Sequence, residues 1–239
     1  MKKTIEAVMD EFLTERKEQL SPQEWNDYRD TLDLLKSHLN GYAYENLSSQ
    51  ERQFFEKHYN APGEASRRFC QLFGPEKIPE NLRMFLDYFL VRKVMAGPGF
   101  SEKAGKISSE FMSWLGEHGY ISNREAEEGS EEGRIASRNL ARAEKAASIL
   151  YRDCRTSRID AKRIADEDYR EFDHFTISRL EPGKIWFLNN YPGGPEDLGP
   201  VRAPEAAVKL LEEDWDISCT LARIKGEWRL IEMGNIYPL

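Results

Sequence analysis

The feature that most constrains the fold is a change in the spacing of apolar residues near residue 165. Before it, apolar side chains recur every three to four positions, as on the buried face of a helix. After it come four β-rich runs, FDHFTISRL, KIWFLNN, WDISCTLARI and EWRLIEMGNIY. Helices first and strands last favour an α+β fold. We expect an all-α N-terminal helical domain, a long connecting helix and a small β-rich C-terminal domain, either barrel-like or a curved sheet.

The clearest helix start in the first half is Ser21-Pro22, an N-cap followed by a first-turn proline. Gly41, just past the last periodic residue, predicts a left-handed C-terminal cap. The run from Ser48 to Glu51 is a capping box for the next helix. Residues 79–96 form the most apolar helical pattern, and Ser101 is expected to open the helix that follows.

Residues 122–133, SNREAEEGSEEG, form a charged stretch punctuated by glycines. Such a composition predicts a connector between domains. A long helical pattern follows from about Arg134 to the mid-160s. We therefore expect a helical domain over 1–121, an acidic linker and basic connecting helix over 122–165, and a β-rich domain over 166–239, with limited proteolysis cutting first at 123–133.

The last 74 residues predict two hairpins, with turns at Glu181–Lys184 and Lys225-Gly226. Between them lie the loop YPGGPEDLGP and a short helix from Pro204 to Glu213. This domain holds three tryptophans, which serve either as core or as platforms on which bases stack. Trp215 alternates in phase with the apolar residues after it, and this favours core for the set Trp186, Trp215 and Trp228.

Charge is distributed unevenly along the chain. The formal net charge is −8, which argues against non-specific nucleic-acid binding by the molecule as a whole. Residues 122–165 nevertheless carry ten basic and eight acidic side chains, against 16 and 19 in residues 1–121 and eight and 15 in residues 166–239. The middle segment is thus the only basic part.

The N-terminus and the cysteines both favour a cytoplasmic protein. In MKKTIEAVMDEF, acidic residues interrupt the stretch that a signal peptide keeps apolar, and no run of 18 apolar residues exists to span a membrane. The cysteines at 70, 154 and 219 are odd in number and lack C-x-x-C spacing. We therefore expect no disulfide framework, no zinc site and thiols that pack as small apolar groups.

Three patches within residues 4–121 carry a family resemblance: TIEAVMDEFLTER, LSPQEWNDYRDTLDLLKSHL and SEKAGKISSEFMSWLGEHGYI. Together they resemble the N-terminal SAM-like, core-binding domain of tyrosine recombinases and phage integrases. In that family the domain forms half of a clamp around duplex DNA, so the resemblance implies a helical DNA-binding module over about half of the chain.

The catalytic half of that family is missing. It needs paired arginines, one in an H-x-x-R motif, and a tyrosine nucleophile near the C-terminus. The four histidines read HLNG, HYNA, HGYI and HFTI, and Tyr237 has no Arg/His constellation near it. The sequence therefore excludes strand transfer, and we expect the protein not to be an enzyme.

Other motifs also favour structural roles. His38, His58, His118 and His174 show no metal-ligand spacing, and the loop Pro192–Pro195 lacks the Gly-Lys-Ser/Thr ending of a phosphate-binding loop. The carboxylates at 212–214 and 216 are typical of a solvated helix end rather than a cation site. We expect no metal and no cofactor.

The best functional signal is the connecting helix. At 100° per residue its basic side chains fall within about 80° of one another, with Ile135, Ala143, Ala146, Leu150, Ala161 and Ile164 opposite. The candidate nucleic-acid-binding residues are Arg134, Arg138, Arg142, Lys145 and Arg152, with Arg163 at the far end.

Two functions are compatible with this pattern. The first is a non-enzymatic protein that binds DNA or RNA through the integrase-like domain and the adjacent basic helix. The alternative is a protein–protein adaptor with no nucleic-acid role, whose basic residues meet an acidic partner or a second copy of the chain.

Overall fold

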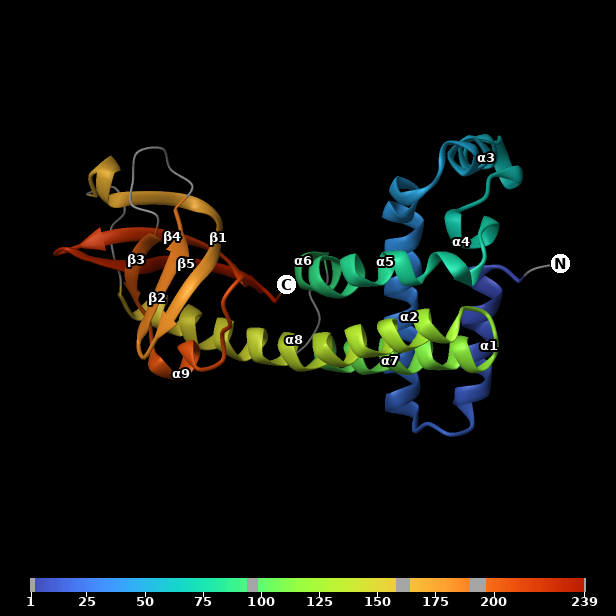
Figure 1. The fold of residues 1–239 in the computed structure, drawn as a ribbon, viewed down its shortest axis with the longest axis horizontal. Coiled ribbons are helices and arrows are strands. Elements are labelled where there is room, and N and C mark those ends of the chain that lie inside the picture. The colour runs from blue at the N-terminus through green and yellow to red at the C-terminus, as the bar shows by residue number, and fades with distance from the viewer. Residues whose placement is uncertain (1–2, 94–98, 158–163, 190–196, 239) are drawn as a thin grey trace. The chain divides into compact units, whose positions relative to one another are not determined.

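The computed structural model describes residues 3–93, 99–157, 164–189 and 197–238. The chain divides into two compact units, Met1–Ser137 and Arg138–Leu239. It is an α+β protein, as the sequence predicts, with helices in the first unit and a small sheet in the second (Figure 1). The division falls within one helix, α8 (Asn123–Ser157), so that helix contributes residues to both units.

The N-terminal unit is built from helices joined by short turns (Figure 1). Its α-helices before α8 are α1 (Ile5–Lys17), α2 (Pro22–Tyr42), α3 (Ser49–Tyr59), α4 (Phe69–Leu72), α5 (Pro79–Met84), α6 (Leu90–Lys93) and α7 (Phe100–Glu117). A π-helical segment, Phe85–Phe89, lies between α5 and α6. The predicted helix over 79–96 is thus described as α5, the π segment and α6, and residues 94–96 lie outside the described residues.

The helix starts follow from capping chemistry. Ser21 accepts a hydrogen bond from the amide of Glu24 while the Glu24 carboxylate accepts one from the Ser21 amide, and Ser48 and Glu51 repeat the arrangement. Both predicted starts are confirmed. The predicted left-handed cap at Gly41 is wrong: α2 continues to Tyr42, and the left-handed backbone conformation is not found at Gly41.

The predicted connector at 122–133 is also wrong, because residues 123–133 form the first turns of α8. Ser122 caps this helix with Glu125, the same S-x-x-E box found at Ser21 and Ser48. The glycines of this segment let the backbone of α8 pack closely against that of α7. They do not mark a flexible connector. A Cβ on Gly133 would lie 2.6 Å from the Ser109 amide nitrogen, and one on Gly105 would lie 2.5 Å from the Ser137 nitrogen.

The C-terminal unit is a five-stranded sheet with a short helix, α9 (Glu205–Val208). Its strands are β1 (Tyr169–Glu181), β2 (Lys184–Leu188), β3 (Asp197–Arg202), β4 (Asp216–Ile224) and β5 (Glu227–Tyr237). The predicted hairpins are β1–β2 and β4–β5. Lys225 and Gly226 turn the second hairpin with φ of 52° and 85°, the left-handed pair that suits a tight turn.

The strands close in the order β1-β2-β3-β5-β4, with β1 pairing back onto β4. The barrel is irregular. Register shifts interrupt most strand pairs, and β3 meets β5 in parallel through only Val201–Trp228 and Arg202–Arg229. Its core is completed by one face of α8, through Ala143, Ala146, Leu150 and Cys154.

Within the described residues, no helix is both long enough and apolar enough to cross a membrane.

Candidate nucleic-acid interface on helix α8

The second half of α8 has one face on the barrel core and one face toward solvent. Ala146 and Leu150 are buried, while Arg138 and Lys145 on the opposite side are exposed. This is the amphipathic arrangement that the sequence predicts. Ile135 departs from it: predicted on the apolar side, it is 40% exposed.

Arg142 does not belong to the exposed set. Its guanidinium forms an ion pair with Glu212 and lies 5.2 Å from the centre of the Trp215 ring. It also donates a hydrogen bond to the Leu211 carbonyl at 3.4 Å, and its side chain is only 26% exposed. A guanidinium held between a carboxylate and an indole ring packs α8 against the barrel, so we assign Arg142 a structural role.

We expect Arg142→Ala to lower the stability of the C-terminal unit by about 1–2 kcal/mol, because it removes a charge-assisted contact and a cation–π contact together. The matched substitution Lys145→Ala, on the exposed side of the same helix, should change stability by less than about 0.5 kcal/mol. Urea unfolding of the two variants measures both values. Equal losses of stability in the two variants would show that Arg142 contributes no more than an exposed lysine does.

Arg134 is also engaged, although weakly. It forms an ion pair with Glu131 one turn earlier, and both side chains are at least half exposed. An exposed pair at this spacing contributes little stability but neutralises the cation locally. Arg163 lies outside the described residues, as does Ala161.

Arg138, Lys145 and Arg152 remain, and we call these three residues the α8 basic face. All three are exposed, and among the described residues none of them forms an ion pair with a carboxylate. They recur every seven positions, so successive side chains lie about 10 Å apart along the helix and within about 40° of one another around it. Arg152 is held by a hydrogen bond from its Nε to the Ser148 carbonyl at 3.2 Å.

Sequence reasoning left out one neighbouring cation, Arg155. It is exposed, and its guanidinium lies 5.9 Å from the ring centre of Tyr151, which is itself 50% exposed. The signal was present in the sequence, because residue 155 lies only about 60° around the helix from Arg152.

The barrel tryptophans are core residues, as predicted. Trp186, Trp215 and Trp228 are 8%, 1% and 8% exposed. Arginines cover their rings as well: Arg179 lies 4.0 Å from the Trp186 ring centre and Arg170 lies 5.2 Å from that of Trp228. Rings enclosed in this way offer no open face on which a base could stack.

The histidines occupy separate environments. His38 is buried, with Nε2 3.2 Å from the Asn81 carbonyl, and burial lowers its pKa to about 4. His58 contacts the Phe54 carbonyl through Nδ1, and His174 packs on the ring of Tyr237. Within the described ranges, no three His, Cys, Asp or Glu side chains gather as metal ligands.

The carboxylates at 212–216 also have separate contacts. Glu212 pairs with Arg142, and Asp216 accepts a hydrogen bond from the Thr176 hydroxyl at 2.6 Å.

All three cysteines are buried free thiols, and burial raises the pKa of Cys70 to about 12 and that of Cys154 to about 11. These thiols are poor nucleophiles. The loop Pro192–Pro195 lies outside the described residues.

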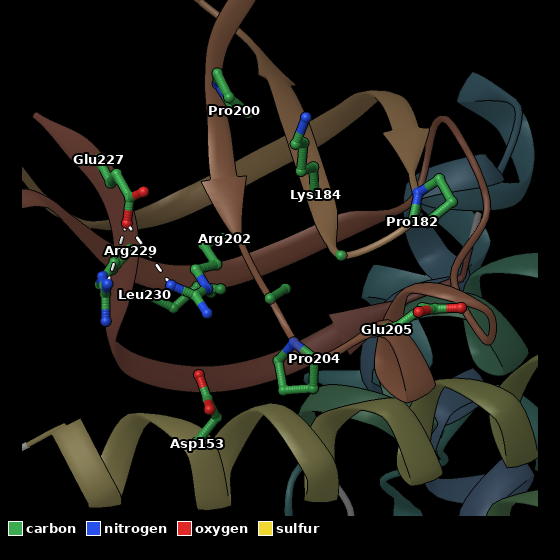
Figure 2. Close-up of a pocket in the computed structure, with 12 residues that line it drawn as sticks. Asp153, Pro182, Lys184, Pro200, Arg202, Pro204, Glu205, Glu227, Arg229 and Leu230 are labelled. Carbon is green, nitrogen blue, oxygen red and sulfur yellow. Dashed lines mark hydrogen bonds and ion pairs between the residues drawn. The ribbon is translucent and has the colours of Figure 1, made fainter.

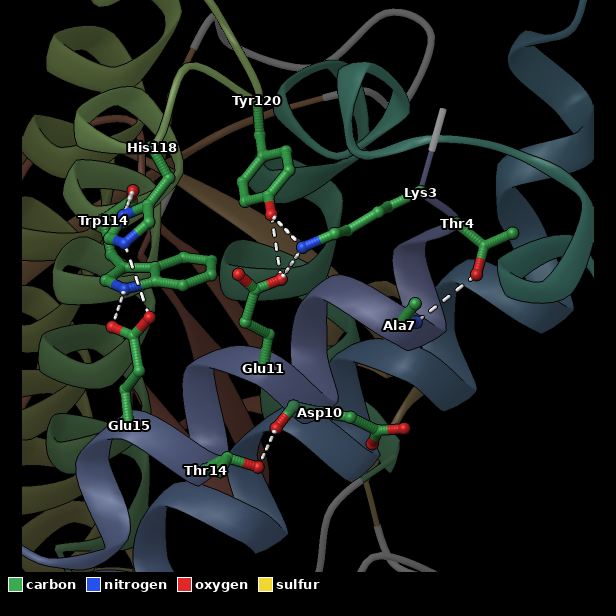
Figure 3. A network of polar contacts seen from close by, with 10 residues as sticks. All are labelled: Lys3, Thr4, Ala7, Asp10, Glu11, Thr14, Glu15, Trp114, His118 and Tyr120. Atoms are coloured by element: carbon green, nitrogen blue, oxygen red, sulfur yellow. Dashed lines mark hydrogen bonds and ion pairs between the residues drawn. The ribbon is translucent and has the colours of Figure 1, made fainter. Parts of the chain in front are cut away.

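A polar cluster of the N-terminal unit joins α1 to the end of α7 (Figure 3). Glu15 accepts a hydrogen bond from the Trp114 indole at 2.7 Å and pairs with His118 at 3.4 Å. One turn away, Glu11 accepts from Lys3 at 2.5 Å and from the Tyr120 hydroxyl at 2.8 Å. Both carboxylates have partners from this cluster, which fits a structural clamp between helices.

Comparison with protein-family models, curated proteins and solved structures finds no match to this chain. The resemblance to the integrase core-binding domain therefore stays a prediction.

Proposed function

We propose that this protein is a non-enzymatic nucleic-acid-binding protein, and that its contact surface is the α8 basic face. The observation that carries the proposal is a set of three exposed cations, Arg138, Lys145 and Arg152, that form no ion pair with a carboxylate in the part of the chain that the structure describes. Phosphate groups are the ligand that such cations attract without requiring a shaped pocket.

The charge distribution along the chain also favours this surface as the contact. Residues 1–121 carry more acidic than basic side chains, so the integrase-like helices do not themselves supply net attraction for phosphate. From Arg134 to Ser157, α8 carries six basic and two acidic side chains. This part of α8 therefore has an excess of basic side chains, although the whole chain is acidic.

The rigidity of the helix also supports the proposal. The α8 basic face is carried on a helix whose opposite side is fixed in the barrel core by Ala146 and Leu150. The backbone that carries these cations is already ordered, so binding costs only the rotamer freedom of the long side chains. Three cations spaced about 10 Å apart cover roughly 20 Å of helix, a length over which several phosphates of one nucleic-acid strand lie.

We expect the full chain to bind nucleic acid in a strongly salt-dependent way. If each cation neutralises one phosphate, the log–log slope of affinity against salt is about −2.7, or about 40-fold between 50 and 200 mM salt. Fluorescence anisotropy with labelled duplex DNA, single-stranded DNA and single-stranded RNA measures the slope and distinguishes the three ligands.

The variant that tests the surface is Arg138→Glu/Lys145→Glu/Arg152→Glu, which leaves Arg142 in place. It should abolish binding and unfold like the parent protein. The matched control is Lys17→Glu/Lys57→Glu/Lys106→Glu, which makes the same charge change at exposed lysines on other helices. It should bind within a few-fold of the parent. Absence of binding to all three nucleic acids at 50 mM salt refutes the proposal and favours an acidic protein partner.

A further inference from the structure

A hollow of about 760 Å³ opens in the barrel unit, and its described lining includes no residue of the α8 basic face (Figure 2). Its charged lining is Lys184, Arg202, Glu227, Arg229, Asp153 and Glu205, and three prolines contribute apolar surface. The volume is in the range of small-ligand sites. We call it the barrel hollow.

Strand register gathers the cations of this hollow. Lys184 on β2 pairs with Arg202 on β3, and Arg202 pairs in turn with Arg229 on β5. Three basic residues thus stand side by side across three neighbouring strands. Like charges directly opposite one another are destabilising, so a row of this kind favours a bound anion.

The protein's own carboxylates offset this row only in part. Arg202 and Arg229 share a single oxygen, Oε2 of Glu227, at 3.9 and 3.1 Å. Lys184 pairs loosely with Glu181 at 3.8 Å. Arg229 also keeps a buried Nε–H that has no acceptor among the described residues. Two guanidiniums therefore depend on one carboxylate oxygen, and Lys184 has only a loose partner in Glu181.

The opposite wall of the hollow is acidic. Asp153 projects from α8 toward the strands that carry Arg202 and Arg229, and Glu205 stands at the start of α9 (Figure 2). Carboxylates accept hydrogen bonds from amino and hydroxyl groups. Glu205 is paired with Lys209 at 2.7 Å, so the cationic row is the side of the hollow that suits an anion.

We propose that the barrel hollow binds a phosphate dianion, presented as free phosphate or as the phosphate of a small monoester such as a nucleoside monophosphate. A phosphate monoester carries about −1.5 to −2 charges at neutral pH, so it can compete with the single Glu227 carboxylate for the row formed by Lys184, Arg202 and Arg229. Its terminal oxygens accept from two guanidiniums and an ammonium at once, whereas a carboxylate has only two oxygens to offer. The inference stands on the barrel unit alone and does not rest on the proposed nucleic-acid function.

Isothermal titration calorimetry of the full chain with AMP, adenosine and inorganic phosphate tests the site. We expect AMP to bind with a dissociation constant below about 1 mM, a modest affinity for a site of this kind. Adenosine, which lacks the anion, should bind at least about 10-fold more weakly, because it forgoes the charge-assisted hydrogen bonds. If inorganic phosphate binds with the same dissociation constant as AMP, this would support the site and identify the free anion as its ligand.

Arg202→Gln should weaken binding at least about 10-fold, because it removes one charge-assisted contact. The Arg202 side chain is 69% exposed, so we expect the variant to fold like the parent protein. Lys225→Gln is the matched control: it removes one charge from the turn between β4 and β5, outside the hollow. It should leave affinity unchanged within about 2-fold. The variant Arg138→Glu/Lys145→Glu/Arg152→Glu should also retain AMP binding. This result would separate the hollow from the proposed nucleic-acid surface.

Three results would overturn the inference. The first is no heat of binding for either phosphate-bearing probe at millimolar concentration. The second is adenosine binding as tightly as AMP. The third is equal loss of affinity in Arg202→Gln and Lys225→Gln, or loss in the α8 variant, since either would move the ligand away from the hollow.

Discussion

Gly133→Ala is expected to destabilise the N-terminal unit by about 2 kcal/mol, although alanine is the better helix former. In a helix interior the replacement of glycine by alanine gains up to about 1 kcal/mol. Here the added Cβ would lie 2.6 Å from the Ser109 nitrogen and 2.8 Å from the Gly105 carbonyl oxygen. Both are backbone atoms that cannot rotate away, so α7 and α8 must separate at a cost of about 3 kcal/mol.

The control is Gly41→Ala in α2, where a Cβ meets nothing within 4 Å. This substitution keeps the helix gain without the clash and should stabilise the protein by about 0.5 kcal/mol, since the site is near a helix end. Calorimetric unfolding of the two variants gives opposite signs. Stabilisation by both substitutions would favour a loose connector over residues 122–133, as the sequence composition predicts.

His38 is expected to make the N-terminal unit acid-sensitive in a defined window. Its folded pKa is lowered to about 4 because the imidazole is buried among the rings of Tyr42, Phe85 and Phe89. The unfolded chain takes up the proton near pH 6.5, whereas the folded chain does so only near pH 4. The free energy of unfolding should therefore fall by about 3 kcal/mol as the pH drops from 6.5 to 4.

Two measurements test this expectation. Proton NMR of the His38 ring gives its pKa directly, and hydrogen exchange of α2 amides gives the stability at each pH. His38→Gln, which retains a donor for the Asn81 carbonyl, should remove this part of the pH dependence whatever its effect at pH 7. His174→Gln, at an exposed site in the barrel unit, controls for the loss of a histidine. A His38 pKa near 6.5 would contradict the prediction.

The glycines of α8 show why part of the fold was misjudged from sequence. Gly129 and Gly133 stand in an acidic stretch, and local composition cannot separate a flexible connector from a helix that another helix approaches closely. The deciding facts are contacts with Met112 and Ser109, which lie more than 15 residues away in the sequence. The capping box formed by Ser122 and Glu125 spans only three positions, so the sequence alone could have revealed this helix start.

The cations of α8 also show what local sequence can predict and what only tertiary contacts decide. Periodicity placed five cations on one side of the helix, and that grouping depends only on helix geometry. It could not tell Arg142, which is held by Glu212 and Trp215, from Lys145, which forms no ion pair among the described residues. Those partners come from the segment before β4, some 70 positions further on.

By itself the sequence determined the α+β order, the capped starts of α2 and α3, the two hairpins and the buried tryptophans, because each depends on neighbours within a few residues. Only the tertiary structure decided which cations stay exposed and which glycines lie against another backbone. It also decided that Lys184, Arg202 and Arg229 form one row, since pairing of β2, β3 and β5 joins residues that no local pattern connects.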